Sequence, residues 1–282
     1  MPGEIAVSAI AYRQGGGGPV TVLSTDSPGL QARACTTLNK EPTMKATRCI
    51  PHVLFLPGLL NDASLFQQQI DALTAVTTTE VADLTQANSI ADMAESALQN
   101  TPEAPCVLVG LSMGGYVAFE IMRRAPERVA GLVLLDTSAR PDTAEGVAAR
   151  VSLMKLAETD LEAVFEQLMP RLSHPLRMNL PAVRGVVHSM MSSLGKDVFI
   201  RQQGAIMTRP DSRPGLARIQ CPTLVICGRQ DLVTPPEMAE EIAHGIPDAQ
   251  LSIVEDCGHL STLDQPDEVS RRLLEWVRNI ER

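Results

Sequence analysis

The fold is decided by the stretch Cys106-Val-Leu-Val-Gly-Leu-Ser-Met-Gly-Gly-Tyr-Val-Ala-Phe-Glu-Ile-Met122. Its first third is a short apolar run typical of a buried strand, and its second half has the composition of a helix. Ser112 lies at the junction, within the pattern Gly-x-Ser-x-Gly. A sharp strand-to-helix turn forces such a serine into a strained conformation, and Gly110 and Gly114 provide the clearance that this turn requires.

This setting predicts that Ser112 is a nucleophile. The turn places its hydroxyl beyond the carboxyl edge of the sheet, and the backbone N–H of Met113 points from the helix N-terminus toward an oxyanion formed there. The five-residue pattern alone occurs by chance in about one chain in ten of this length. The alternative interpretation is a glycine-rich turn that only packs tightly, so the prediction depends on a partner base elsewhere in the chain.

Short apolar runs alternate with helical ones from residue 52 onward, which is typical of an α/β fold. We expect a mostly parallel central sheet with helices on both faces. The expected strands are 52–57, 79–84, 105–111, 131–135, 223–227 and 250–254. The expected helices in the same part of the chain are 64–73, 89–98, 115–124, 235–244 and 266–280. A capping box, Thr234-Pro-Pro-Glu237, predicts the start of one of them.

The strand signal disappears for about 85 residues after Leu135, and helix-forming stretches such as 144–157 and 161–168 replace it. We therefore predict a helical cap inserted into the sheet domain. The domain boundaries that follow are 46–139 and 216–282 for the sheet domain and 140–215 for the cap.

Residues 1–45 do not join this pattern. Ile5–Tyr12 and Val20–Leu23, separated by four glycines, predict a β-hairpin before the first parallel strand. An N-terminal extension without a catalytic role fits the sequence equally well.

A serine hydroxyl needs a base and a group that orients the base. Among the five histidines, His259 follows a predicted strand in a short loop, at the same sheet edge as Ser112. Asp231 also follows a strand and precedes a helix, so we favour it as the acid over Asp136, which ends another strand. Asp256 is too close to His259 in the sequence for the two side chains to face each other.

Composition excludes several classes of partner. The formal net charge is −9 with a pI near 5.1, and Lys and Arg do not cluster, which argues against nucleic acid. No apolar run approaches the roughly 18 residues that span a bilayer, and the first residues lack the features of a secretory signal. The six cysteines show no metal-binding spacing. We expect a cytoplasmic protein with reduced thiols, no metal and no membrane partner.

With these residues in place, the chain resembles the α/β-hydrolase superfamily over roughly residues 50–282. The likeness rests on the segments around Ser112, Asp231 and His259, which follow the family's chain order of nucleophile, acid and histidine. The resemblance implies a Ser-Asp-His triad that needs no cofactor. It also implies a second oxyanion donor in Leu56-Pro-Gly-Leu-Leu60, for which we favour the N–H of Leu59 over that of Leu60. Pro57 replaces the histidine usual in the family.

The resemblance predicts hydrolysis of small or medium carboxylic esters through an acyl-enzyme on Ser112. An acyltransferase, a lactonase or a thioesterase would use the same triad, and a non-catalytic ligand-binding member would keep the fold. Six methionines in the cap region either line an adaptable apolar pocket or serve ordinary helix packing: Met154, Met169, Met178, Met190, Met191 and Met207.

Overall fold

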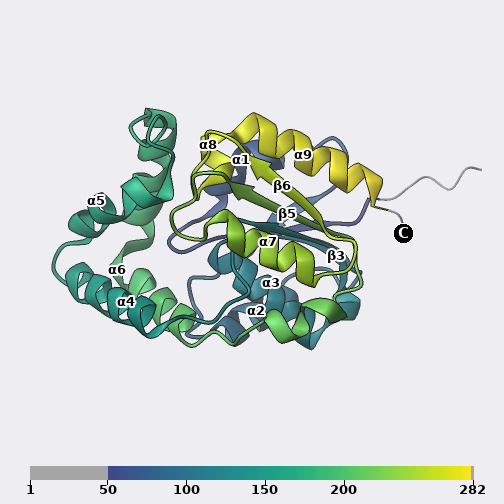
Figure 1. Cartoon of the computed structure of the whole chain (residues 1–282), viewed down its shortest axis with the longest axis horizontal. Coiled ribbons are helices and arrows are strands. Elements are labelled where there is room, and N and C mark those ends of the chain that lie inside the picture. Colours follow the sequence, from purple (N-terminus) through teal and green to yellow (C-terminus); the bar gives the residue numbers. More distant parts are fainter. Residues whose placement is uncertain (1–49, 281–282) are drawn as a thin grey trace, which may run out of the picture. The chain divides into compact units, whose positions relative to one another are not determined.

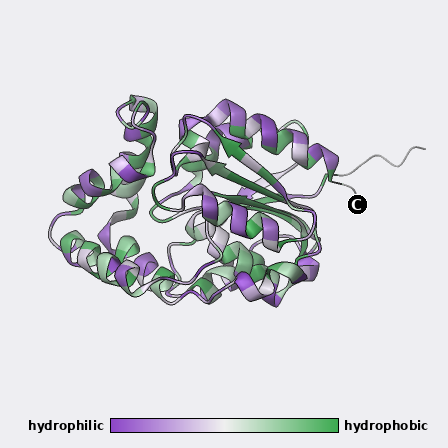
Figure 2. Cartoon of the chain, viewed as in Figure 1, coloured by the Kyte–Doolittle hydropathy of each residue, from purple (hydrophilic) through white to green (hydrophobic). Residues whose placement is uncertain are grey.

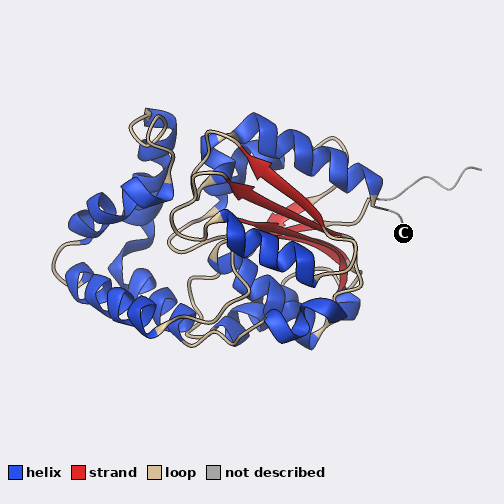
Figure 3. Ribbon diagram, viewed as in Figure 1, coloured by secondary structure: helices blue, strands red, loops and turns tan. Residues whose placement is uncertain are grey.

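A six-stranded parallel sheet forms the centre of the protein in the computed structural model, which describes residues 50–280 (Figures 1 and 3). The strand order is β2-β1-β3-β4-β5-β6, and every neighbouring pair is parallel. The strands are β1 (Val53–Leu56), β2 (Thr79–Val81), β3 (Cys106–Leu111), β4 (Val129–Leu135), β5 (Thr223–Gly228) and β6 (Gln250–Val254). The predicted fold class is confirmed.

Alternate residues of the strands point to opposite faces, because the side-chain period of a strand is two. Val53 and Phe55 of β1 enter one hydrophobic core, and Leu54 and Leu56 enter the other. All four are fully buried, so the strand is continuously hydrophobic, as strands covered on both faces are. Figure 2 shows this as green strands in the middle of the molecule.

Helices cover both faces of the sheet (Figure 1). Helices α1 and α9 belong to the core of one face, and α2, α3 and α7 to the core of the other. The α-helices of the sheet domain are α1 (Gln67–Leu73), α2 (Ile90–Gln99), α3 (Met113–Arg124), α7 (Pro236–Gly245), α8 (Ser261–Asp264) and α9 (Pro266–Asn279). The short helical turns of the described chain are η1 (Ala63–Phe66), η2 (Pro126–Arg128), η3 (Pro181–Gly185), which lies between α5 and α6, and η4 (Arg213–Arg218).

The span from 140 to 215 contains three further α-helices and no strand within the described residues. These are α4 (Ala144–Ala157), α5 (Leu161–Leu172) and α6 (Val186–Met207), and Figure 1 shows them beside the sheet domain, on the side to which the strands point. Phe165 and Phe199 are buried in the same core as α1 and α9. Helix α6 had no counterpart among the expected helices, because a kink at Gly195 (φ 78°) interrupts its periodicity.

Among the strands, β2 differs most from its expected bounds. β2 ends at Val81 rather than at residue 84, because Ala82 N makes the last bond to β1, at Phe55 O (2.9 Å), and Asp83 Oδ1 then accepts the Thr85 amide in a turn. The predicted N-terminal hairpin lies outside the described residues. No helix within residues 50–280 combines the length and apolar character needed to cross a bilayer.

Candidate active site

The turn between β3 and α3 has the strained geometry that its sequence predicts. Ser112 has φ 53° and ψ −112°, a conformation that L-residues rarely adopt. A Cβ on Gly114 would lie 1.8 Å from Leu56 O, and one on Gly110 would lie 2.5 Å from Gly114 O, so both positions require glycine. Thr137 Oγ1 donates a hydrogen bond of 2.7 Å to Ser112 O and fixes the turn from β4.

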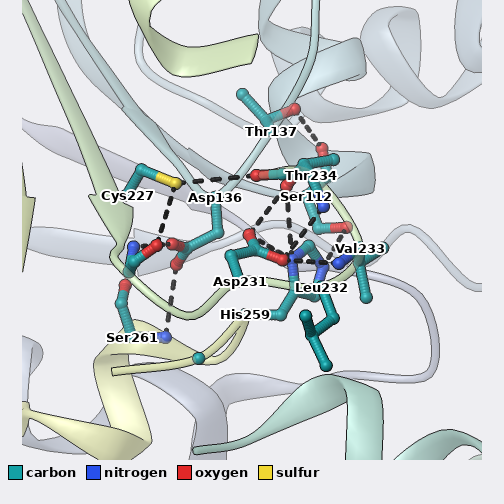
Figure 4. A network of polar contacts seen from close by, with 12 residues as sticks. Ser112, Asp136, Thr137, Cys227, Asp231, Leu232, Val233, Thr234, His259 and Ser261 are labelled. Atoms are coloured by element: carbon teal, nitrogen blue, oxygen red, sulfur yellow. Dashed lines mark hydrogen bonds and ion pairs between the residues drawn. The ribbon is translucent and has the colours of Figure 1, made fainter. Parts of the chain in front are cut away.

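The structure brings Ser112, His259 and Asp231 together from three separate loops (Figure 4). His259 Nε2 lies 2.9 Å from Ser112 Oγ, and His259 Nδ1 lies 2.8 Å from Asp231 Oδ2. A proton on Nδ1 satisfies the Asp231 carboxylate and leaves Nε2 free to accept the Ser112 hydroxyl proton. The imidazole is only 2% exposed, so water competes weakly for either bond.

Four hydrogen bonds hold the Asp231 carboxylate. Oδ1 accepts the amides of Val233 (2.7 Å) and Thr234 (2.9 Å), while Oδ2 accepts His259 Nδ1 and Thr234 Oγ1 (2.9 Å). The predicted capping box is therefore wrong. Helix α7 begins at Pro236 without a side-chain cap, because the Thr234 hydroxyl is bonded to the charged acceptor instead. The sequence pattern around Thr234 does not indicate this role.

Burial and charge have opposite effects on the pKa values of His259 and Asp231. Burial favours neutral forms, which lowers the pKa of His259 and raises that of Asp231. Burial is the largest single effect on each group, but the attraction between imidazolium and carboxylate and the hydrogen bond between them, together with the Val233 and Thr234 amides on Asp231, outweigh it. The pKa of His259 therefore lies above its ordinary value and that of Asp231 below its ordinary value.

The two rival carboxylates occupy other positions. Asp136 is fully buried, and its oxygens accept the amides of Gly228 (2.9 Å) and Ser261 (3.2 Å), which join the acid loop to the histidine loop. Burial and the nearby Asp231 raise the pKa of Asp136 to about 8. Asp256 is exposed. Neither makes the bond to His259 that Asp231 makes.

One cluster in the described residues has the composition of a metal site. Atoms of Asp136, Cys227 and Asp231 lie within 4.8 Å of one another. Both carboxylates already accept hydrogen bonds on each oxygen, and burial raises the pKa of the Cys227 thiol, which keeps it protonated. The donor set therefore fits a hydrogen-bonded network better than a cation.

The predicted oxyanion donors can be compared directly. Leu60 N donates to Gln202 Oε1 at 2.8 Å, so this amide is occupied. The amides of Leu59 and Met113 have no acceptor among the described residues. The geometry therefore favours Leu59 over Leu60. Gln202, on α6, also donates to Leu84 O at 3.2 Å, and no motif in the sequence marks it.

Ser112 and His259 line a cavity of about 270 Å³, near the lower end of the ~300–1,000 Å³ range of small-molecule pockets. The cap contributes apolar walls, including Leu153, Phe165 and Val187. Of the six cap methionines, Met191 lines the cavity and the other five do not. The cap also provides three charged lining residues, Asp142, Arg150 and Arg171, none of which belongs to a motif recognisable in the sequence.

A model of the alpha/beta hydrolase family matches residues 7–272. Among curated proteins, a pimeloyl-[acyl-carrier protein] methyl ester esterase of Chromobacterium violaceum is 28% identical over 238 residues, which cover 82% of this chain and 85% of that protein. A putative non-heme bromoperoxidase of Mycobacterium tuberculosis is 28% identical over 203 residues, covering 68% and 74% respectively.

Solved structures show the same similarity. A thermophilic esterase from Thermogutta terrifontis superposes with a TM-score of 0.75 at 30% identity, covering 82% of this chain and 91% of that one. An enol-lactonase from Burkholderia xenovorans has a TM-score of 0.74 at 23% identity, covering 81% and 92%, and supports the fold alone. These relatives differ in reaction, so the substrate has to be inferred from the cavity itself.

Proposed function

The chain belongs to the alpha/beta hydrolase family, and from this membership we propose that it hydrolyses small or medium carboxylic esters through an acyl-enzyme on Ser112. The observation that carries the proposal is the hydrogen-bonded chain from Ser112 Oγ to His259 and on to Asp231, at 2.9 Å and 2.8 Å, which opens onto the cavity. The esterases among the relatives support the reaction type.

The first half of the reaction forms the acyl-enzyme. Ser112 Oγ attacks the ester carbonyl as its proton passes to His259 Nε2, and Asp231 stabilises the imidazolium that results. The tetrahedral oxyanion accepts hydrogen bonds from the free amides of Met113 and Leu59. When the intermediate collapses, the C–O bond to the alcohol breaks and His259 returns its proton to the leaving oxygen.

The second half repeats these steps with water. His259 Nε2 removes a proton from water, the hydroxide attacks the acyl carbon, and the C–O bond to Ser112 breaks as Ser112 Oγ regains the proton. The carboxylic acid leaves, and no cofactor enters the balance. An alcohol in place of water would give acyl transfer, and an internal ester would give lactone opening by the same steps.

The test is a panel of p-nitrophenyl esters with acyl chains of increasing length, together with simple lactones. We expect turnover of short and medium esters and a loss of at least about a thousandfold in kcat for Ser112→Ala. The double variant Ser112→Ala/His259→Ala should lose little more, because the two residues act as a unit. Near-wild-type turnover by folded Ser112→Ala would contradict the proposal. Product partitioning with added butanol separates hydrolysis from acyl transfer.

A further inference from the structure

The cavity beside Ser112 carries positive charge in a chain whose formal net charge is −9. Arg150 of α4 and Arg171 of α5 line it, and Asp142 is the one carboxylate among its lining residues. An apolar ester would gain nothing from two guanidinium groups in this position. Their presence suggests that part of the substrate is anionic.

Asp142 cannot neutralise this charge, because it is shared. Its Oδ2 lies 2.7 Å from Arg150 Nε, and its Oδ1 lies 3.0 Å from Arg209 Nη1. Arg209 is built into the structure: its side chain is 8% exposed, donates to the carbonyls of Arg140 and Ile206 and lies over the Tyr116 ring. One carboxylate between two guanidinium groups leaves one positive charge in excess.

Arg150 is held so that part of its guanidinium remains available. Nε is bonded to Asp142, and Nη1 donates to Gln203 Oε1 at 2.7 Å. Gln203 is itself only 1% exposed. Nη2 of Arg150 has no acceptor among the described residues, so two of the five N–H groups are used to fix the group and others remain free to bind a ligand. This is a preorganised donor rather than a freely rotating surface arginine.

Arg171 adds a second uncompensated charge. Its Nη2 donates to Leu232 O (3.0 Å) in the loop that carries Asp231, and no carboxylate pairs with it within residues 50–280. Arg171 and Arg150 reach the cavity from different helices. The two guanidinium groups and Ser112 therefore surround the same cavity, in which a bound anion would be partly removed from water and held by charge-assisted bonds.

We propose that the substrate is a half-ester of a dicarboxylic acid, whose free carboxylate binds Arg150 while the ester carbonyl lies at Ser112. The inference rests on the proposed esterase function and adds the substrate class. Arg150 acts as a specificity residue that touches substrate and takes no part in proton transfer. Arg171 strengthens the same positive potential from α5.

The kinetic test compares mono-p-nitrophenyl esters of succinic, glutaric, adipic and suberic acids with the same compounds in which the free acid is methylated. We expect wild-type kcat/KM to favour the free acid over its methyl ester by at least tenfold at one chain length. Arg150→Met should abolish this preference, mainly by raising KM for the free acid. Raising the salt concentration should weaken the wild-type preference.

Two further variants control this result. Lys196→Gln removes one positive charge from α6, where Lys196 pairs with Glu158 and does not line the cavity, and should leave the preference intact. Arg150→Lys keeps the charge but loses the planar fork, so we expect it to show an intermediate preference for the free acid. This variant provides the test if Arg150→Met folds poorly. Equal kcat/KM for free acid and methyl ester at every length, or a preference that survives both Arg150 variants, would overturn the proposal.

A binding experiment separates this proposal from the esterase function. Calorimetric titration of Ser112→Ala with glutarate, adipate and suberate measures carboxylate binding without turnover. Binding that is lost in Ser112→Ala/Arg150→Met supports the carboxylate site even if no ester is hydrolysed. Rapid ester hydrolysis by an enzyme that binds none of these anions would instead leave the esterase function standing and refute the carboxylate site.

Discussion

Replacing Gln202 by Met should lower catalysis without touching any residue of the proton relay. Gln202 is 1% exposed, accepts the Leu60 amide at 2.8 Å and donates to Leu84 O at 3.2 Å. Methionine has a similar volume and can form neither bond. Leu60 has φ 51°, so the loop that presents the Leu59 amide is held in a strained conformation that Gln202 helps to maintain.

The magnitude follows from these contacts. Gln202→Met leaves two buried groups, the Leu60 amide and Leu84 O, without a partner. At about 1–3 kcal/mol for each group, the variant should lose about 2–6 kcal/mol of unfolding free energy. Complete loss of one oxyanion donor costs about 10²–10³ in kcat. A displaced rather than absent Leu59 amide should cost about 10–100-fold in kcat, with little change in KM.

The assay is p-nitrophenyl butyrate hydrolysis combined with urea unfolding, with Gln69→Met as the matched control. Gln69 is also fully buried and donates to Thr262 O, Pro266 O and Ser270 Oγ, but none of these bonds reaches the loop of Leu59 and Leu60. We expect Gln69→Met to lose stability while retaining wild-type kcat. Equal kcat values in the two variants would refute the assignment of Gln202 to the oxyanion loop.

Three further predictions follow from the site. The acid limb of the kcat/KM profile should lie above pH 6.5, because His259 must be neutral to accept a proton and its pKa is raised. Asp231→Asn should move this limb to lower pH and lower kcat by about 10⁴. A wild-type limb below pH 6.5 would contradict this prediction. The native state keeps a proton on Asp136 up to about pH 8, whereas the unfolded chain releases it near 3.8, so unfolding releases a proton between these values. The contribution of Asp136 to the free energy of unfolding is therefore full below pH 3.8 and falls as pH rises, by up to about 1.4 kcal/mol per pH unit. The urea midpoint should decline less steeply with rising pH in Asp136→Asn than in the wild type, and identical slopes would contradict the assignment. Gly114→Ala should lower the free energy of unfolding, measured in urea, by at least about 3 kcal/mol. Gly204→Ala, whose Cβ meets nothing within 4 Å, should not lower it. Equal stabilities of the two variants would show that the turn at Gly114 tolerates a side chain.

The parts of the fold and site that were predictable from sequence are those encoded locally. β3 was expected at 105–111 and is found at 106–111, because a fully buried strand shows its hydrophobic run directly. Ser112, Asp231 and His259 each follow a predicted strand, and the carboxyl ends of parallel strands lie at one edge of a sheet. Their proximity could therefore be inferred before any distance was known.

The residues that were missed act through partners far away in the sequence. Gln202 contacts Leu60 across 142 positions, and Arg150 contacts Gln203 across 53. Nothing near either residue in the chain indicates which groups it meets. Thr234 was misassigned for a related reason: its sequence fits a capping box, but the folded protein places a charged carboxylate within reach of its hydroxyl.

The central claim is that Ser112 is a nucleophile activated by His259, and covalent labelling tests it most directly. A fluorophosphonate probe should add one equivalent to the wild-type protein, and peptide mass spectrometry should place the adduct on Ser112. Labelling should be lost in Ser112→Ala and slowed at least about a hundredfold in His259→Ala, because the base no longer removes the hydroxyl proton. Folded wild-type protein that remains unlabelled, or that carries the adduct on another residue, would contradict the account.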